Sequence, residues 1–557
     1  MPEYLTFKES NCKNCYRCIR RCPVKAIGFS GEQAHVVAEE CILCGECFVN
    51  CPQNAKSIRE DVQLARQLLQ SGAQVYVSIA PSYVAAMPGI SFNSLKTALK
   101  KLGFADAGET AVGAAIVKKH YEDLIREGKQ KVLLSTCCHS VNMLVQKYFP
   151  DLTSCLAPVV SPMLAHAISI REQQPDMKIV FIGPCISKKE EADMNVGYID
   201  CVLTFEELFA WFKEENIVPK KDGLSEEIRR RTRLFPTTGG ILDSMDIEDS
   251  AYSSMAVDGV DNCMTVLRDI ANGIVDYCFI EMSACHGSCI GGPAFGKDHS
   301  PVRSRIAVQK NAGPEDFSVE FPDKEKLIRN IPFSPLRRFR PGSSAVEKMM
   351  EKMGKTLPEH ELNCGFCGYD TCREKAAAIL TGKAELSMCL PYLMARAESF
   401  SDNIINNTPN GVIVLNHDLE VQQINAAACR LMNIRDEKNV LGRHIVCILD
   451  PAPFEDVITK NQNSGEKKFY LAEYDEYVMM SIIYDANYDI IIAIMRDITQ
   501  EQNIRANRDK LNRNTVAVAD KLIEKQMRTV QEIASLLGET TAETKVALDK
   551  LKETLQG

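Results

Sequence analysis

The central part of the chain, residues 59–345, alternates short apolar segments with longer segments of helical periodicity. Four apolar segments, which begin at Val75, Val132, Ile179 and Tyr277, have the length of buried strands, and each ends in a loop rich in Ser, Cys, Pro or Gly. Strands that alternate with helices predict a parallel α/β sheet. Ligands of such sheets bind beyond the carboxyl ends of the strands. We therefore expect these loops to converge on one site.

Residues 396–500 follow a different pattern, with a strand pair around a polar turn at 416–418, then helices and a closing hairpin that ends in D-I-T. The segment resembles a PAS domain. A haem or a reactive thiol stays open for four of its side chains, although ordinary core or surface roles are the simpler interpretation: Cys429, Cys447, His417 and His444. We assign no PAS cofactor from the sequence.

The last segment, 501–557, is predicted to be a helix with a heptad seam. Its apolar or small residues recur at alternating steps of four and three: Ile523, Met527, Val530, Ala534, Leu537, Thr541, Thr544, Leu548, Leu551 and Leu555. The pattern favours a coiled-coil homodimer or a partner helix, but one amphipathic helix packed on its own domain would show similar spacing. The sequence "GETT" at 538–541 weakens the seam midway.

Composition and charge narrow the class of protein. With 45% hydrophobic and 25% charged residues, the chain has the composition of a soluble globular protein. Its net charge of −9 argues against a nucleic-acid partner, which usually requires a basic surface. We see no signal peptide at the start and no apolar run near the roughly 20 residues of a membrane helix. A cytoplasmic protein is expected.

Cysteine is unusually frequent, with 23 residues in 557. In a reducing compartment metal ligation explains such usage better than disulfides do. Residues 12–23 and 41–52 each read C-x2-C-x2-C-x3-C-P, the run of two-cluster 4Fe-4S ferredoxins, in which the fourth Cys of each run ligates the other cluster. The expected ligand sets are Cys12, Cys15, Cys18 and Cys51, and Cys41, Cys44, Cys47 and Cys22. Paired zinc knuckles are the alternative.

A third group of cysteines follows the central part. Cys364, Cys367, Cys372 and Cys389 fall as C-x2-C-x4-C-x16-C, with a helix-like stretch before the last one. The pattern resembles the small single-cluster domain of several redox proteins and implies a third 4Fe-4S centre. The spacing alone leaves zinc open.

The central loops resemble the signature loops of the FeFe-hydrogenases. They read "STCCHSV" at 135–141, "GPCISKKEE" at 183–191 and "EMSACHGSCIGG" at 281–292, and "IAPS" at 79–82 and "TTGG" at 237–240 extend the match. The resemblance implies that Cys138, Cys185, Cys285 and Cys289 hold a 4Fe-4S cube. Cys289 would bridge this cube to a di-iron centre with CO, cyanide and dithiolate ligands, which together form the H-cluster.

The resemblance also implies roles for three neighbouring side chains. Anionic cyanide ligands need buried donors, and Lys188 and Ser82 match the family donors. Cys137 faces the di-iron side, and a thiol with a pKa near 8.5 can accept and return a proton. Cys137 is thus expected to relay the proton released by heterolytic H2 splitting, with a structural thiol as the alternative.

Several positions depart from the family pattern. The two methionines of the second and third loops are replaced by Gly183 and Ser283, which should enlarge the pocket. The stretches 111–117 and 156–160 lack the acids and the serine of the family's proton route, so protons beyond Cys137 must take another route or move slowly. His139 is a candidate participant, although a lone histidine is more often structural.

Together the motifs predict five parts: a ferredoxin-like domain (1–58), a hydrogenase domain of α/β fold (59–345), a single-cluster domain (346–395), a PAS domain (396–500) and a signalling helix (501–557). This order resembles the sensory FeFe-hydrogenases and implies an H2-reacting oxidoreductase of low turnover. Its expected partners are a redox protein, a downstream kinase or phosphatase, maturation proteins for the di-iron site, and a second copy. A non-catalytic redox-signalling protein and a metabolic hydrogenase are the alternatives.

Overall fold

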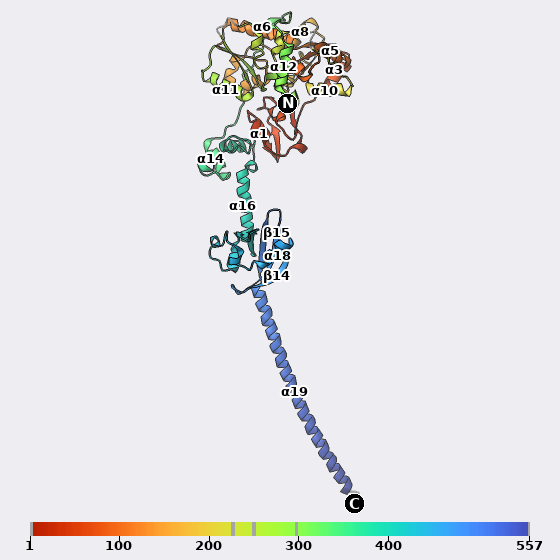
Figure 1. Cartoon of the computed structure of the whole chain (residues 1–557), viewed down its shortest axis with the longest axis vertical. Helices are drawn as coiled ribbons and strands as arrows, with labels where there is room; N and C mark the ends of the chain where they lie inside the picture. The colour runs from red at the N-terminus through yellow and green to blue at the C-terminus, as the bar shows by residue number, and fades with distance from the viewer. Residues whose placement is uncertain (1–3, 224–228, 248–251, 296–298, 555–557) are drawn as a thin grey trace. The chain divides into compact units, whose positions relative to one another are not determined.

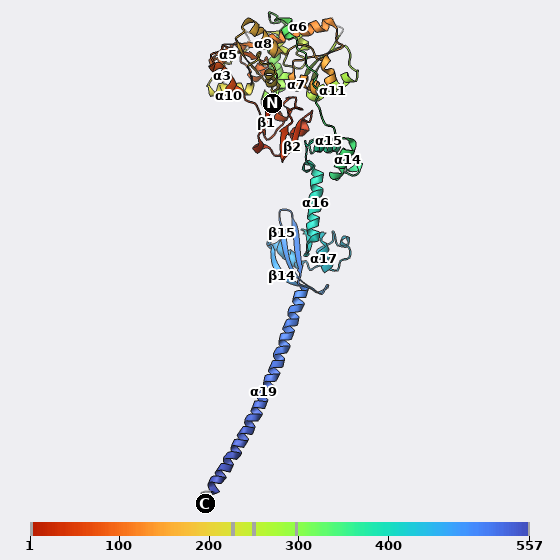
Figure 2. The same cartoon turned by 180° about the vertical axis from the view of Figure 1, so that it is seen from behind.

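The computed structural model describes residues 4–223, 229–247, 252–295 and 299–554. The chain divides into two compact units, Met1–Leu393 and Met394–Gly557 (Figures 1 and 2). The expected multidomain α+β and α/β fold is confirmed. Among the described residues, none of the helices combines the length and the apolar character that crossing a membrane requires.

Residues 4–58 fold around two antiparallel strand pairs. Strand β1 (Leu5–Phe7) pairs with β4 (Lys56–Ile58), and β2 (Ile27–Ser30) pairs with β3 (Gln33–Val36). The short helices α1 (Arg17–Arg21) and α2 (Glu46–Val49) each lie within one cysteine run. The pairing of the first strand with the last brings the two runs together.

The central strands are parallel, as predicted, but they lie in two sheets rather than one. The first sheet has the order β6-β5-β8-β9 and the second the order β10-β11-β7. Their bounds are β5 Val75–Ile79, β6 Asp106–Glu109, β8 Lys178–Gly183 and β9 Cys201–Thr204, then β7 Val132–Leu134, β10 Ser253–Asp258 and β11 Cys278–Ser283. Apolar periodicity identifies a buried strand but not the strand with which it pairs, so the division was not visible in the sequence.

Helices cover both sheets. They are α3 Val62–Gln70, α4 Tyr83–Ala86, α5 Phe92–Lys101, α6 Ala111–Glu127, α7 His139–Tyr148, α8 Pro162–Gln173, α9 Ser187–Asp193, α10 Phe205–Glu214, α11 Val260–Ala271, α12 Pro301–Asn311 and α13 Lys324–Leu327. Helices α6 and α8 pack very closely, because a Cβ added to Gly113 would lie 2.1 Å from the carbonyl oxygen of Pro162. The small residues of 111–117 thus permit this contact.

The remainder of the first unit packs against the ferredoxin-like part. It contains α14 (Ser343–Lys352) and α15 (Cys372–Leu380). The Arg20 guanidinium donates to the carbonyls of Gly365 and Phe366, and the amide of Phe29 donates to the carbonyl of Lys383. The third cysteine group is therefore held next to the first two.

Helix α16 (Leu390–Asn407) begins directly after Cys389 and leads to the second unit. The second unit contains a five-stranded antiparallel sheet of order β13-β12-β16-β15-β14. Its elements are β12 Gly411–Asn416, β13 Val421–Ile424, α17 Ala426–Leu431, α18 Ala452–Lys460, β14 Ser464–Leu471, β15 Glu476–Asp485 and β16 Ile490–Asp497.

The predicted C-terminal helix is a single element, α19 (Thr499–Thr554), which continues through the "GETT" sequence (Figure 1). Apolar seam residues such as Ile523, Val530 and Leu537 are about 60% exposed in the single chain. Leu555 lies outside the described residues. The apolar seam is thus open to water along the helix in the single chain.

Candidate metal centre

The loops that follow β5, β7, β8 and β11 meet at one cavity of about 120 Å³. The two sheets thus contribute to a common site, although each supplies only part of its wall. Seven residues expected from the sequence line this cavity: Ser82, Cys137, Cys138, Cys185, Lys188, Cys285 and Cys289. The structure brings all of them together from positions spread over more than 200 residues.

The four expected cube ligands influence each other electrostatically. Burial raises the pKa of Cys285 well above its ordinary value, and the neighbouring thiols Cys185, Cys138 and Cys289 raise it further. Burial likewise raises the pKa of Cys138, with a further contribution from Cys185. Thiols in such surroundings become thiolates only when a cationic centre compensates their charge. The donor set therefore suits a cationic iron–sulfur core.

Ser82 provides an independent test of whether an anionic group fits here. Its hydroxyl is completely buried and has no hydrogen-bond partner among the described residues. A buried hydroxyl without a partner costs free energy, on the order of 1–3 kcal/mol. Because Ser82 lines the cavity, a ligand with acceptor atoms would satisfy it, as the cyanide ligands of an H-cluster would.

Lys188 lies in the first turn of α9, directly after the loop that carries Cys185. Its ammonium group donates to the carbonyl of Cys137 at 3.1 Å and to the Glu191 carboxylate at 2.5 Å. The Glu191 charge raises the pKa of Lys188 against the lowering effect of burial. The ammonium has three donors, and these two contacts leave one for the cavity. A solvated surface lysine, the plain alternative, does not describe this position.

Tyr121 on α6 was not identified from the sequence. Its hydroxyl oxygen lies 3.3 Å from the Cys137 sulfur and 3.2 Å from the Thr136 hydroxyl, and it accepts a hydrogen bond from the Thr136 amide at 2.8 Å. Burial raises the pKa of Cys137 to about 12, while the contact with Tyr121 opposes this rise. The partner of Cys137 away from the cavity is thus a phenol rather than a carboxylate.

His139 also lines the cavity but has a nearby acidic partner. Its Nε2 atom lies 3.3 Å from the Glu190 carboxylate, so this side chain joins α7 to α9. The contact supports a positioning role for His139.

The third loop is fixed through Glu281 at the end of β11. Its buried carboxylate accepts hydrogen bonds from the amides of Gly239, Ile241 and Leu242, and this contact ties "TTGG" to the loop. Burial raises the pKa of Glu281 to about 7, against the effect of these donors. Asp258 holds the other side of the loop by accepting from the Gly287 amide at 2.9 Å.

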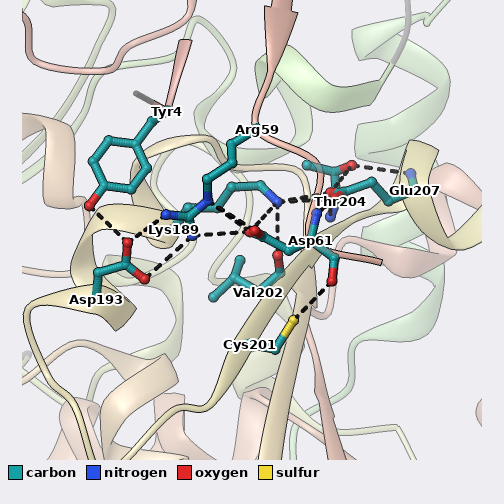
Figure 3. Close-up of polar contacts among 9 residues, drawn as sticks. All are labelled: Tyr4, Arg59, Asp61, Lys189, Asp193, Cys201, Val202, Thr204 and Glu207. Carbon is teal, nitrogen blue, oxygen red and sulfur yellow. Dashed lines mark hydrogen bonds and ion pairs between the residues drawn. The ribbon is translucent and has the colours of Figure 1, made fainter. Parts of the chain in front are cut away.

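The second loop is fixed by Lys189, whose side chain is completely buried (Figure 3). Its ammonium group donates to Asp61 at 2.8 Å, to Glu207 at 3.0 Å and to the carbonyl of Val202 at 2.9 Å. These three partners saturate its donors. Asp61 lies just after the ferredoxin-like part, and Glu207 forms the capping box of α10. Lys188 and Lys189 are neighbours, so the network that holds one also positions the other.

Arg59 extends this network toward the N-terminus (Figure 3). It donates to Asp61 at 3.2 Å and to Asp193, at the end of α9, at 2.6 Å. Asp193 also accepts from the Tyr4 hydroxyl at 2.9 Å. Both ends of the ferredoxin-like part are therefore linked to the helix that carries Lys188.

The ferredoxin-like part contributes directly to the cavity wall through Leu43 and Cys44. Between the two modules, Gly45 adopts φ +80°, and a Cβ at this position would lie 2.5 Å from the Pro293 side chain. A glycine is required for both reasons. Cys44 also raises the pKa of Cys285, after burial and the nearer thiols, so the second cysteine group adjoins the central one.

The eight N-terminal cysteines lie in two groups in the structure. A separate cavity is lined by Cys12, Cys15, Cys18 and Cys51. Cys22 lies with the other run, since it raises the pKa of Cys41, Cys44 and Cys47 in addition to their burial.

The third group encloses a cavity of its own, lined by Cys364, Cys367, Cys372 and Cys389. All 23 cysteines are free of disulfides. Among the described residues, no three or more His, Cys, Asp or Glu side chains are arranged to hold a single metal ion.

Four family models match separate segments of the chain. Residues 73–293 match the model of the iron only hydrogenase large subunit, C-terminal domain, and residues 4–62 match a 4Fe-4S dicluster domain. Residues 358–391 match an Fe-S cluster model, and residues 399–470 match the PAS fold.

Two curated relatives are similar to this chain over 52% of its length, each at 24% identity. They are iron hydrogenase 1 of Clostridium pasteurianum and the periplasmic Fe hydrogenase large subunit of Nitratidesulfovibrio vulgaris. The alignments cover 64% and 85% of these relatives, so the chain spans less than two thirds of the Clostridium protein. A solved FeFe-hydrogenase from Chlamydomonas reinhardtii aligns with 47% of the chain and 92% of its own length, at 20% identity and a TM-score of 0.38.

Replacing Lys189 with Met should destabilise the first unit by about 3–5 kcal/mol, because Glu207 would lose the ammonium that pairs with it and Asp61 would keep only Arg59. Lys96→Met is the matched control, since Lys96 pairs with Asp106 at the surface and its loss should cost about 0–1 kcal/mol. Denaturant unfolding followed by circular dichroism measures both. Equal effects of the two substitutions would contradict the importance of the Lys189 network.

Proposed function

We propose that the whole chain is a slow H2-reacting sensor, because residues 73–293 match the model of the iron only hydrogenase large subunit, C-terminal domain. The observation that carries this proposal is the convergence of four cysteines, Cys137, Lys188 and Ser82 on one cavity beside an N-terminal cysteine group. We propose that the chain consists of the same five parts that the sequence predicts, from the ferredoxin-like domain to the signalling helix.

An H-cluster, when bound, would supply the metal centre for heterolytic H2 cleavage. Cys138, Cys185, Cys285 and Cys289 would hold it, with Cys289 as the bridging ligand. Lys188 and the otherwise unpartnered Ser82 hydroxyl would donate hydrogen bonds to its anionic ligands. These donors also orient the group, because each is fixed by its own helix or turn.

Cys137 is the residue that we assign to proton exchange. Its thiol lines the cavity on one side and contacts the Tyr121 hydroxyl on the other. A proton taken up by Cys137 would pass to Tyr121 as the phenol gives its own proton to the Thr136 hydroxyl, 3.2 Å away. Such a route lacks a carboxylate, which supports low turnover. Ser283 lines the cavity, whereas the Phe181 side chain occupies the space beside Gly183.

Electrons would leave through the N-terminal clusters. The ligand sets Cys12, Cys15, Cys18 and Cys51, and Cys22, Cys41, Cys44 and Cys47, would hold two 4Fe-4S clusters, and Cys44 lies in the wall of the central cavity. Cys364, Cys367, Cys372 and Cys389 would hold a third. A redox partner protein would exchange electrons with this group.

The PAS domain and α19 support a signalling output. We propose that two copies of the chain pair through the seam of α19. A kinase or phosphatase would bind the paired chains and respond to their redox state. Maturation proteins would be required to insert the di-iron part. The 23 free cysteines favour a reducing compartment, and we propose the cytoplasm.

Infrared spectroscopy of anaerobically matured protein tests this function. Bands from CO and cyanide are expected, and they should shift under H2. If the protein shows only the signals of 4Fe-4S clusters and its spectrum does not change under H2, it is instead a non-catalytic redox-signalling protein. Sustained H2 production from a reduced carrier, at the rates of metabolic enzymes, would overturn the sensory assignment.

Cys137→Ala should lower the H2-oxidation rate by about 10²-fold or more, since positioned acid–base groups contribute about 10²–10⁴-fold. The infrared bands should persist, because the cube ligands are intact. Cys155→Ala is the control: Cys155 lies in none of the proposed sites and should leave the rate unchanged. Full activity of the Cys137 variant would rule out its role in proton exchange.

Val530→Asp should convert a homodimer into a monomer, because it places a charge in the seam of α19. Lys525→Asp introduces the same side chain at a position outside the seam, so this variant should keep the molar mass of the homodimer in solution. Light scattering after size exclusion distinguishes the two. A wild-type protein that is monomeric at micromolar concentration would refute the pairing.

A further inference from the structure

The cavity of the third cysteine group contains two buried lysines in addition to its four thiols. Lys375, on α15, is completely buried, and Lys355 is 7% exposed; both line the cavity. Lys375 donates to the carbonyl of Glu385, and Lys355 donates to the carbonyl of His360 at 2.7 Å. The cavity of Cys12, Cys15, Cys18 and Cys51 has one buried cation, Lys56, with Lys13 and Arg17 exposed at its edge.

Buried cations favour the reduced form of a cluster. A 4Fe-4S core with four thiolates carries a charge of −2 when oxidised and −3 when reduced, so the attraction of a fixed ammonium group grows on reduction. Water screens this attraction little at Lys375, because no part of the side chain is exposed. The third cluster should therefore be reduced more readily than it would be without Lys375.

Electrons can reach this cluster from the ferredoxin-like part. Lys25 donates to the carbonyl of Gly368 at 3.1 Å, and Gly368 lies so close to Ile19 that an added Cβ would be 2.8 Å from its side chain. Tyr369 lies between the two groups: besides burial, both Cys367 and Cys22 raise its pKa. The second and third ligand sets thus have a common neighbour.

The third cluster is also next to the start of helix α16. Its last ligand, Cys389, directly precedes the first residue of α16. The carbonyl that Lys375 holds belongs to Glu385, in the same turn, and the Glu385 carboxylate accepts from the Gly31 amide at 2.8 Å. When the charge of the cluster changes, the electrostatic force on the Lys375 ammonium changes too. The hydrogen bond from Lys375 to the Glu385 carbonyl would transmit this change to the turn.

We propose that Lys375 raises the potential of the third cluster so that electrons collect there, and that it links the charge of this cluster to the turn that begins α16. Each event adds one electron to the oxidised core; the four cysteines stay bound as thiolates, and no bond breaks. The electron comes from H2 or from a chemical reductant. The inference rests on the proposed function only for the H2 source.

The test uses the full chain, reconstituted anaerobically with iron and sulfide and titrated with dithionite under EPR detection. Cys372→Ser identifies the third-cluster signal by its loss. In the unaltered chain this cluster should be reduced first. In Lys375→Met and Lys375→Gln, its ratio of reduced to oxidised form at a fixed potential should fall at least tenfold, about 59 mV for one electron. The Gln variant keeps a hydrogen-bond donor without the charge.

Lys348→Met is the control, since Lys348 is an exposed cation of α14 in the same part of the chain. It should leave the ratio unchanged. The proposal is overturned if the Lys375 variants titrate like the wild type, if they lose the third cluster, if Lys348→Met shifts the ratio equally, or if another cluster is reduced first. Failure to react with H2 would refute the proposed function alone, because dithionite supplies the electrons here.

Discussion

The structure of the first unit depends on one constraint, that a charge removed from water must be paired. Thiols gather in the central cavity and in the third cysteine group, and buried lysines lie beside both. Lys188 pairs with Glu191 beside the cavity, Lys189 pairs with Asp61 and Glu207 behind it, and Lys375 lies within the third cysteine group. Each lysine is held by carboxylates or carbonyls, so its position is fixed before any cluster binds. The cations therefore define where the anionic groups can be placed.

This constraint also explains how separate modules share a site. Without contacts to other segments, the second loop would be poorly oriented, because the helix that follows it, α9, has only seven residues and ends near the surface. Its pairing with Asp61 and Arg59 ties it to the segment that leaves the ferredoxin-like part. Gly45 then allows that part to approach the third loop within contact distance of Pro293. The same ion pairs therefore determine both how the two modules pack and where the second loop lies in the cavity wall.

The sequence predicted what local spacing determines. The cysteine runs, the parallel strands and the antiparallel PAS domain follow from short patterns, and the comparisons and the fold agree with them. Contacts between distant residues have no such pattern. Lys189 and Asp61 are 128 residues apart, and nothing in "SKKEE" shows that the second lysine would face a carboxylate. Tyr121 was missed for the same reason, since a tyrosine in an amphipathic helix is usually a core residue. The pairing of β7 with β11 instead of β5 is likewise a tertiary property.

The packing of α6 on α8 affects which polar side chains can lie near Cys137, the residue that we propose for proton exchange. Gly113 can carry no side chain, because the Pro162 carbonyl occupies the space. An acid at this point of the helix would separate α6 from α8 and disturb the sheet beneath them. Tyr121, two turns further along the same helix, is then the polar group that contacts Cys137. Burial raises the pKa of Tyr121 well above its ordinary value, so its phenol releases a proton only as it receives another. Under the proposed function, such a site would exchange protons slowly, which would limit a catalyst but would let a sensor keep one redox state for longer.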